Sequence, residues 1–380
     1  MTTSRDTDEF FLRQALNLAR QGIGLTSPNP CVGAIMVDAK GVIAGTGSHT
    51  YDGLKHAEIL ALEHAGEKAR GAALYINLEP CSHQGRTAPC ADALVAAGIS
   101  RVVACMQDPN PLVSGQGFAK LRSAGIAVSS GILEDQAKAL NESFAKYIRH
   151  HTPLVTLKAA MTLDGKIAPP PSQSPKSAAA WITGESARAH VQELRHQHDA
   201  ILAGVGTVSA DDPLLTDRSG RQRRRPLLRV VLDSRLRLPL ESRLVKTAQD
   251  DVLVLCAFAE EKKKKRLLKL GIRVEQLLTA TSDGHPDLAA VVHFLGQMEI
   301  TSLMIEGGAM VNGAALAAGI VDKVFLYYAP TILGGTVSVP FAGGAGFASI
   351  SDAAKVKSIR LHRFGEDFAV EGCLKDPYAD

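Results

Sequence analysis

The stretch PCSHQGRTAPC, residues 80–90, decides how the first half of this chain is interpreted, because its two cysteines complete a set of ligands begun by His56. Cys81, Cys90 and His56 offer two sulfurs and one imidazole, which suit zinc and leave one corner of a tetrahedral ion open to water. Zinc lowers the pKa of that water towards ~7, and Glu58 can carry protons beside the metal. The pattern predicts a hydrolytic site with one zinc ion per chain.

A structural zinc site is the main alternative for these residues. Such a site has four protein ligands, and His83 is placed to be the fourth. A structural site gives no role to Glu58, so the hydrolytic interpretation is favoured. A binding module built on structural zinc would hold the metal without turnover, and the net charge of +3 disfavours a nucleic-acid surface. The remaining cysteines are expected to be small buried hydrophobes: Cys31, Cys105, Cys256 and Cys373.

Helix and strand signals alternate around the candidate ligands. Residues 56–65 are expected as a helix, 73–78 as a strand and 90–97 as a helix, with Pro89 before it and Gly98 after it as start and stop signals. A helix N-terminus favours the thiolate form of cysteine, which is the form that binds metal. Further strands are expected at 31–37, 41–45 and 102–106, and a further helix at 118–124. This alternation predicts an α/β fold with helices on both faces of a sheet.

A domain boundary is expected near residues 150–153. A helix-like stretch at 135–149 precedes it, and a strand at 154–160 follows it. Because 380 residues exceed one typical domain, we expect domains at 1–150 and 151–380. The Pro/Ser-rich segment 169–177 is expected to be a mobile loop.

Composition limits the class of protein. Six cysteines in so long a chain do not make a disulfide framework. The N-terminus lacks the features of a signal peptide, and no apolar run reaches the ~18 residues that span a bilayer. The small net charge does not indicate nucleic acid or a membrane surface as a partner. The sequence therefore predicts a cytoplasmic protein that binds neither nucleic acid nor a membrane.

The second half lacks the G-x-G-x-x-G of a Rossmann fold after a strand. Two glycine turns do follow apolar strands, at residues 204–207 and 306–308. A glycine turn before a helix lets backbone N–H groups approach a phosphate, although such turns are also common without a ligand. The turns alone are a weak signal of a nucleotide.

His-Ala-Glu followed by Pro-Cys and a second cysteine is the signature of the zinc nucleobase deaminases. Two residues usually separate the cysteines, whereas eight do so here. The chain instead resembles the bifunctional riboflavin-biosynthesis deaminase/reductase family, to which residues 80–90 are similar. The resemblance continues through the segments 26–33, 158–166, 181–184, 199–207, 211–218, 231–234, 306–308 and 333–335.

The resemblance implies a cytidine-deaminase-like three-layer α/β/α domain followed by a dihydrofolate-reductase-like α/β domain. The implied reactions are deamination of 2,5-diamino-6-ribosylamino-4(3H)-pyrimidinone 5′-phosphate and then reduction of ribosylamino to ribitylamino. The implied cofactors are zinc and NADPH, and the implied assembly is a homodimer. A deaminase for another substrate, with a degenerate second half, is the alternative.

The resemblance also implies a role for individual residues. The expected clamp on the substrate 5′-phosphate is Arg195 with Arg218, and Glu306 would hold a ribose hydroxyl. The proton donor of the reductase would be Lys158 or Asp211. The full implied set is Glu58, Lys158 and Asp211 for catalysis; His56, Cys81 and Cys90 for zinc; Asn29, His49, Arg86, Arg195, Leu215, Arg218 and Glu306 for substrate; and Met161, Trp181, Thr207, Asp211, Ser234, Gly307 and Gly308 for NADPH.

Other roles remain open for several of these residues. Asn29 lies between two prolines and is equally suited to a turn. Trp181 is equally suited to core packing, and His49 to a surface or packing role. Ala179 stands where the family usually has a serine, which departs from the expected substrate contacts of the reductase.

Overall fold

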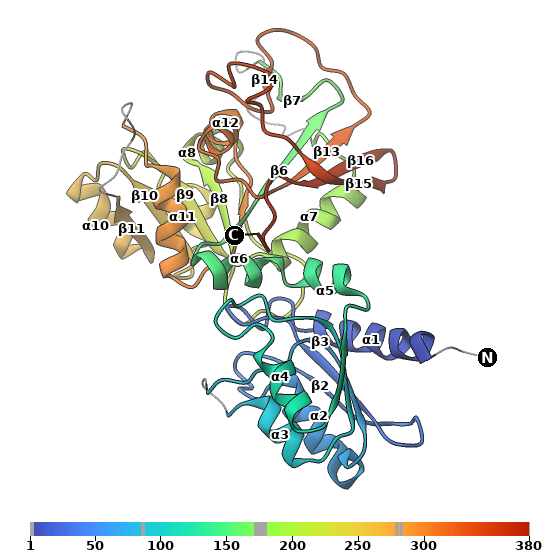
Figure 1. Ribbon diagram of the computed structural model, residues 1–380. Coiled ribbons are helices and arrows are strands. Elements are labelled where there is room, and N and C mark those ends of the chain that lie inside the picture. Colours follow the sequence, from blue (N-terminus) through green and yellow to red (C-terminus); the bar gives the residue numbers. More distant parts are fainter. Residues whose placement is uncertain (1–3, 85–87, 171–180, 278–280, 282–283, 380) are drawn as a thin grey trace. The chain divides into compact units, whose positions relative to one another are not determined.

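The computed structural model describes residues 4–84, 88–170, 181–277, 281 and 284–379. Arg86, Ala179 and most of the Pro/Ser-rich segment therefore lie outside the described residues. The chain divides into two compact units, one of residues 1–150 with 222–224 and 380, and one of residues 151–221 with 225–379. Each unit is described by itself below (Figure 1).

The first unit is built on a five-stranded sheet with the strand order β2-β1-β3-β4-β5. The pairs β1–β2 and β1–β3 are antiparallel, while β3–β4 and β4–β5 are parallel. Residues of β1, β3 and β4 are almost all buried, as expected where helices cover both faces. The strands are β1 (Gly33–Val37), β2 (Ile43–Ser48), β3 (Ala73–Leu78), β4 (Arg101–Met106) and β5 (Ala127–Ser130).

Helices cover both faces of this sheet. A Cβ added to Gly33 would lie 2.2 Å from the carbonyl oxygen of Ala15 in α1, and one added to Gly47 would lie 2.1 Å from that of Ala57 in α2. Gly47 pairs with Ala34, the neighbour of Gly33, so the two glycines face opposite sides of the sheet. The helices are α1 (Ser4–Arg20), α2 (Ala57–Ala65), η1 (Gly66–Ala69), α3 (Cys90–Ala96), α4 (Gln116–Ser123), α5 (Glu134–Leu140) and α6 (Glu142–His150).

The single helix expected at residues 135–149 is wrong. The chain forms two helices, α5 and α6, which are separated at Asn141. The side chain of Asn141 is buried and bonds to the backbone of Cys31 rather than to solvent. A long-range contact of this kind leaves no periodic signal in the sequence.

The second unit has a nine-stranded sheet with the order β11-β10-β9-β8-β12-β6-β13-β16-β15. The first seven strands of that order, from β11 through to β13, pair in parallel. The last two strands, β16 and β15, pair antiparallel at one edge of the sheet. A small sheet pairs β7 with β14. The strands are β6 (Leu154–Thr162), β7 (Lys166–Ala168), β8 (Ala200–Gly204), β9 (Leu228–Leu232), β10 (Val252–Cys256), β11 (Ile272–Gln276), β12 (Ser302–Ile305), β13 (Lys323–Ala329), β14 (Val339–Pro340), β15 (Lys357–Phe364) and β16 (Asp367–Cys373).

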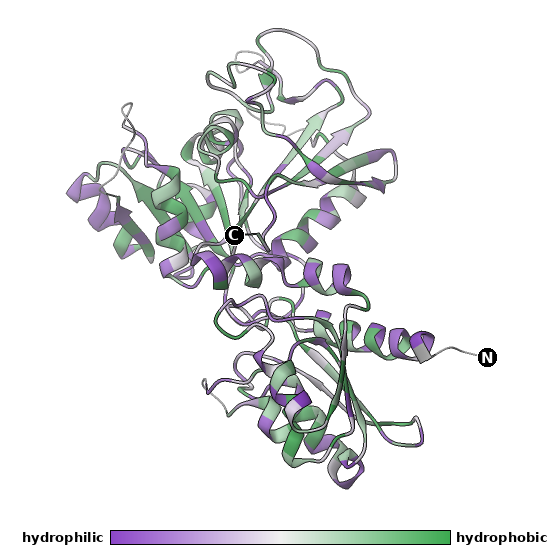
Figure 2. Ribbon diagram, viewed as in Figure 1, coloured by the Kyte–Doolittle hydropathy of each residue, from purple (hydrophilic) through white to green (hydrophobic). Residues whose placement is uncertain are grey.

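Two hydrophobic clusters pack on this large sheet. One includes apolar residues of α7, α9 and α10, and the other includes those of α11 and α12. Figure 2 shows hydrophobic residues concentrated in the strands of both units. The helices are α7 (Glu185–Gln197), α8 (Val205–Asp211), α9 (Arg243–Lys246), α10 (Glu261–Lys269), α11 (Leu288–Gln297) and α12 (Ala309–Ala317).

The chain order places a ligand-binding edge in the second unit. Strand β12 is inserted between β8 and β6, so the order of parallel strands reverses there. In open α/β sheets, ligands bind beside the carboxyl ends of strands at such a reversal. Among the described helices, none is both long and apolar enough to cross a membrane.

Candidate active sites

His56, Cys81 and Cys90 meet in the first unit. The Nδ1 atom of His56 lies 3.5 Å from the sulfur of Cys81 and 3.2 Å from that of Cys90. All three ligand atoms lie within 4.8 Å of one another. The sequence separates these residues widely, and the fold brings them together because α2, α3 and the end of β3 share one edge of the sheet.

The spacing of these atoms fits a zinc ion. Tetrahedral zinc with Zn–N of ~2.0 Å and Zn–S of ~2.3 Å requires a nitrogen-to-sulfur separation of about 3.5 Å. The two separations from His56 agree with that value to within a few tenths of an ångström. His83 is exposed and does not join the group found among the described residues. The structure therefore gives three protein ligands rather than the four of a structural site.

Helix starts hold two of the ligands. His56 is the N-cap of α2, and Cys90 is the first residue of α3. The backbone N–H of Cys90 donates to the sulfur of Cys81 at 3.3 Å. The pKa of Cys81 is lowered, first by its hydrogen bond with the Cys90 side chain and further by His56. The pKa of Cys90 is raised, first by the same hydrogen bond, so the thiolate of this pair lies on Cys81, which follows a strand, and not on the cysteine at the helix start.

Glu58 lies in the first turn of α2, beside the ligands, and is 3% exposed. Burial raises its pKa to about 7, and the neighbouring Cys81 adds to that rise, while His56 and a hydrogen bond with Cys90 oppose it. A carboxyl group with a pKa near neutrality can both accept and return a proton at working pH. The position of Glu58 suits a proton carrier at this metal group.

Asn29 and His49 contact each other, and His49 lies next to the expected zinc ligand His56. The amide nitrogen of Asn29 lies 3.0 Å from Nε2 of His49, and the imidazoles of His49 and His56 are 5.4 Å apart. Nδ1 of His49 donates to the carbonyl oxygen of Lys55, since a carbonyl only accepts. The amide nitrogen of Asn29 thus faces the ring of His49, and its amide oxygen does not.

Sequence reasoning missed two further carboxyl groups, Glu79 and Asp108, near this site. The carboxylate of Glu79 accepts from the backbone N–H groups of Asp108, Gly115 and Phe118 at 3.0, 2.9 and 3.1 Å. Burial raises the pKa of Asp108 to about 6, and Glu79 and Cys81 are among its electrostatic neighbours. The signal that could have found Asp108 is a carboxylate two residues after the buried strand β4, within the sequence Asp-Pro-Asn-Pro.

In the second unit, Glu306 forms ion pairs with two basic side chains, Lys158 and Arg195. Its Oε1 atom lies 3.0 Å from Nζ of Lys158, and its Oε2 atom accepts from Nε and Nη2 of Arg195 at 3.2 and 2.9 Å. Burial would raise the pKa of Glu306, but Lys158 and Arg195 outweigh burial and lower it to about 2. Arg195 also donates to the carbonyl oxygen of Thr216 at 2.9 Å. Much of the Arg195 guanidinium is thus engaged with protein atoms.

Arg218 belongs to the same surroundings. Its guanidinium donates to the hydroxyl of Thr216 at 3.2 Å, and burial followed by the nearby Arg195 lowers its pKa. Leu215 has a buried side chain and a left-handed backbone with φ of 55°. Such a conformation is strained for leucine and is commonly retained at functional sites. A substrate contact of Leu215 would therefore come from its backbone.

The two glycine turns lie beside each other. A Cβ added to Gly308 would come within 3.4 Å of the hydroxyl of Thr207. Gly308 is the N-cap of α12, and α8 begins directly after Gly204 at the end of the neighbouring strand β8. Paired helix N-termini at the carboxyl edge suit a dinucleotide phosphate, so the residues present fit NADPH.

The other predicted cofactor residues are distributed around this edge. Trp181 is 71% exposed, which excludes core packing, and the guanidinium of Arg188 lies 5.2 Å from the centre of its ring. The hydroxyl of Ser234 lies 2.7 Å from Nδ1 of His285, a residue that sequence reasoning missed. Met161 is buried in β6, whereas Asp211 is exposed at the last position of α8. The structure thus brings Lys158, and not Asp211, against Glu306.

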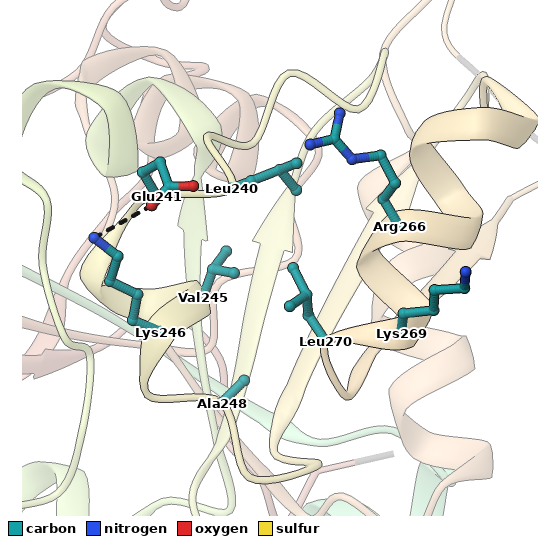
Figure 3. A pocket seen from close by; sticks show the side chains of 8 residues that line it. All are labelled: Leu240, Glu241, Val245, Lys246, Ala248, Arg266, Lys269 and Leu270. Carbon is teal, nitrogen blue, oxygen red and sulfur yellow. Dashed lines mark ion pairs between the residues drawn. The ribbon is translucent and has the colours of Figure 1, made fainter.

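A hollow in the second unit lies away from these residues (Figure 3). It adjoins the residues that precede β10 and β11, which is the edge opposite the glycine turns. Its cation Lys246 pairs with Glu241 at 3.4 Å. No predicted site residue is among its lining residues: Leu240, Glu241, Val245, Lys246, Ala248, Arg266, Lys269 and Leu270.

Comparison with known proteins supports both sites. Residues 5–106 match the cytidine and deoxycytidylate deaminase zinc-binding region, and residues 153–370 match the RibD C-terminal domain. The chain belongs to the RibD family. The riboflavin biosynthesis protein RibD of Actinobacillus pleuropneumoniae is 42% identical, over 98% of this chain and 96% of that protein. RibD of Escherichia coli is 40% identical, over 95% and 97% of the two chains.

Solved RibD structures agree with the fold. A structure of Acinetobacter baumannii RibD superimposes with a TM-score of 0.84 and 35% identity, covering 97% of this chain and 99% of that one. The Thermotoga maritima diaminohydroxyphosphoribosylaminopyrimidine deaminase/5-amino-6-(5-phosphoribosylamino)uracil reductase gives 0.82 and 34%, covering 98% and 99%. The expected family and fold class are confirmed. The alternative of a degenerate second half is wrong, because the RibD C-terminal domain matches residues 153–370.

Proposed function

We propose that this chain carries out two consecutive steps of riboflavin biosynthesis, with zinc in the deaminase site and NADPH in the reductase site. The substrate is 2,5-diamino-6-ribosylamino-4(3H)-pyrimidinone 5′-phosphate, which is deaminated and then reduced to the ribitylamino product. The observation that carries the proposal is the meeting of His56, Cys81 and Cys90 at zinc-binding distances with Glu58 beside them. Family membership over both halves supports the second step.

Held by His56, Cys81 and Cys90, zinc would supply the deaminase site with a water whose pKa is near ~7. Glu58 takes a proton from the attacking water and delivers it to the ring nitrogen. As oxygen bonds to the ring carbon and the bond to the exocyclic nitrogen breaks, Glu58 helps the leaving amine depart as ammonia. Asn29 presents its amide oxygen to N–H groups of the pyrimidine, because its amide nitrogen is held by His49. Arg86 is a further substrate contact in this proposal.

NADPH, held at the two glycine turns, would supply a hydride to C1′ of the ribose. Opening of the sugar ring releases an oxygen that needs one proton, and we assign the donor to Lys158 because its ammonium group already pairs with Glu306. Asp211 is the alternative donor. Glu306 orients a ribose hydroxyl, and Arg218 contacts the 5′-phosphate together with the backbone near Leu215.

The role of Arg195 is divided in this proposal. Its two bonds to Glu306 fix the carboxylate, and in this proposal its guanidinium also contacts the substrate phosphate. The residues assigned to NADPH are Met161, Trp181, Thr207, Asp211, Ser234, Gly307 and Gly308. Ser234 and the neighbouring Arg235 are the candidates for contact with the 2′-phosphate.

We further propose that residues 1–150 form the deaminase domain and residues 151–380 the reductase domain. The protein acts in the cytoplasm on a small phosphorylated pyrimidine, as a homodimer, without a nucleic-acid or membrane partner. Size-exclusion chromatography with light scattering tests the assembly, since a monomeric mass would contradict it.

The function is tested by supplying purified protein with the diaminopyrimidinone phosphate. Ammonia release is measured first, and NADPH is then added while its absorbance is followed. We expect one ammonia for each substrate and one NADPH oxidised for each deaminated product. Absence of ammonia would contradict the deaminase assignment, and ammonia without NADPH oxidation would contradict the reductase assignment.

A further inference from the structure

Two buried asparagines hold the backbone of Cys31. The N–H of Cys31 donates to Oδ1 of Asn141 at 2.8 Å. The carbonyl oxygen of Cys31 accepts from Nδ2 of Asn141 at 3.1 Å and from Nδ2 of Asn77 at 2.9 Å. Asn77 continues the contact by accepting from the N–H of Gly33 at 2.8 Å. Four hydrogen bonds therefore fix the backbone of residues 31 and 33 to two distant parts of the chain.

Both asparagines are enclosed by protein. Asn77 is 0% exposed and Asn141 is 1% exposed. Buried polar groups are costly unless they are paired, so each amide is strongly restricted to this one arrangement. Asn77 lies in β3, which leads to the zinc ligand Cys81, and Asn141 lies in the break between α5 and α6. The fixed backbone is thus tied both to the ligand-bearing strand and to the end of the first unit.

The hydrogen bonds from Asn77 and Asn141 to Cys31, called the clamp below, restrict the nearby residue Asn29, which is the expected substrate contact. Residue 31 follows Asn29 with only Pro30 between them, and proline restricts that link. The N–H of Asn29 donates to the carbonyl oxygen of Thr26 at 2.9 Å, which closes the turn. The side chain of Asn29 then reaches His49, whose ring lies next to that of His56. Movement of Cys31 would shift Asn29 with respect to the metal group.

We propose that Asn141 is a positioning residue of the deaminase reaction, which with Asn77 clamps Cys31 so that Asn29 faces the pyrimidine at the zinc site. This inference rests on the proposed function. It also extends the working deaminase beyond residues 5–106, the part matched by the zinc-binding family, to Asn141. The interruption between α5 and α6 is then a requirement of the site, because a continuous helix would engage residue 141 in a different geometry.

The test uses two variants of the full chain, Asn141→Ala and the isosteric Asn141→Asp. Alanine removes both contacts with Cys31, while aspartate keeps the acceptor for its N–H and loses the donor to its carbonyl. We expect the KM of deamination to rise by up to about 100-fold for Asn141→Ala and less for Asn141→Asp, since small displacements of a positioning group have effects of this order. We expect kcat to change less, and the zinc content and the NADPH reaction to stay as in the wild type.

Asp8→Ala is the matched control. Asp8 is 4% exposed and bonds to Arg101 and Tyr75 in the same unit, away from residues 29–33. Its removal weakens the unit without touching the clamp. We expect a lower melting temperature with an unchanged KM. A similar rise of KM in Asp8→Ala would show that stability rather than position controls substrate binding, and would overturn the proposal.

A second readout does not depend on activity. Hydrogen exchange at the amide of Cys31 reports the bond to Asn141 directly. We expect this amide to exchange faster in Asn141→Ala, while the amide of Gly33, held by Asn77, keeps most of its protection. Unchanged exchange at Cys31, or an unchanged KM in a folded and zinc-loaded variant, would overturn the clamp. Faster exchange at Cys31 in the variant, together with a wild-type protein that releases no ammonia, would leave the clamp standing and refute the proposed function instead.

Discussion

Two carboxyl groups at the candidate sites, buried Glu58 and partly buried Glu306, have opposite shifts of pKa because their neighbours differ. Glu58 lies against sulfur atoms, and burial raises its pKa to about 7. Glu306 is held between Lys158 and Arg195, which outweigh burial and lower its pKa to about 2. The first group is suited to moving protons, and the second to remaining an anion that orients its partners.

Glu58→Gln tests the first of these roles. Glutamine keeps the size of the side chain but can neither take nor return the proton. We expect zinc content to be unchanged and ammonia release to fall by a factor on the order of 100 to 10,000, the usual contribution of general acid–base catalysis. NADPH oxidation with the deaminated product supplied directly is the control and should be unaffected. Full deamination in this variant would refute the role of Glu58.

Glu306→Gln tests the second role through the pH dependence of stability. The pKa of about 2 in the folded protein lies below the ordinary value of 4.5, so the stabilisation is complete above about pH 4.5 and is lost as the pH falls towards 2. Glutamine leaves Lys158 and Arg195 without their anion, at a cost of roughly 3–5 kcal/mol near neutral pH. Denaturant unfolding of the second unit should show this difference narrowing between pH 4.5 and 2. A difference that stays constant with pH would contradict the account.

The meeting of His56, Cys81 and Cys90 with Glu58 beside them could be predicted from the sequence, because these residues lie in short motifs of distinctive chemistry. Asn77, Glu79 and Asn141 could not, since an isolated asparagine or glutamate gives no sign of its partner. Their function depends on contacts between residues that are far apart in the chain. Arg195 and Glu306 were both expected as substrate contacts, but their pairing with each other became visible only in the structure.

At the scale of elements, the zinc site depends on how closely α2 lies on β2. Gly47 in β2 allows this approach, because a Cβ there would lie 2.1 Å from the carbonyl oxygen of Ala57. Ala57 stands between His56 and Glu58, so the position of the first helical turn sets both side chains. Helix starts and strand ends near the site were predictable from capping and glycine signals. The break at Asn141 was not, because burial of a polar side chain overrode the helical periodicity.

Gly47→Ala should displace the first turn of α2. We expect destabilisation of the first unit by about 1–3 kcal/mol or more from overpacking, with weaker zinc binding and little ammonia release. Gly41→Ala in the same hairpin is the control, since a Cβ there meets nothing within 4 Å and brings only the local strain of a φ of 80°. Zinc titration by a competing chelator measures the difference. Equal zinc affinity in Gly47→Ala and the wild type would contradict this account of the helix.

At the scale of the whole molecule, two compact units carry separate sets of functional residues. The zinc ligands and Glu58 belong to the first unit, and Lys158, Glu306 and the glycine turns belong to the second. The α/β class of both was predictable from alternating elements and from the resemblance to a known family. The nine-stranded order was not, because strand order depends on pairings that no local pattern encodes.

The central claim is that one metal ion serves one of two independent reactions. It is tested by removing zinc with a chelator and assaying both reactions, each with its own substrate supplied. We predict that ammonia release is lost and returns with one equivalent of zinc, while NADPH oxidation with the deaminated pyrimidine continues at its original rate. Ammonia release that persists in protein shown by elemental analysis to contain no zinc would contradict the account.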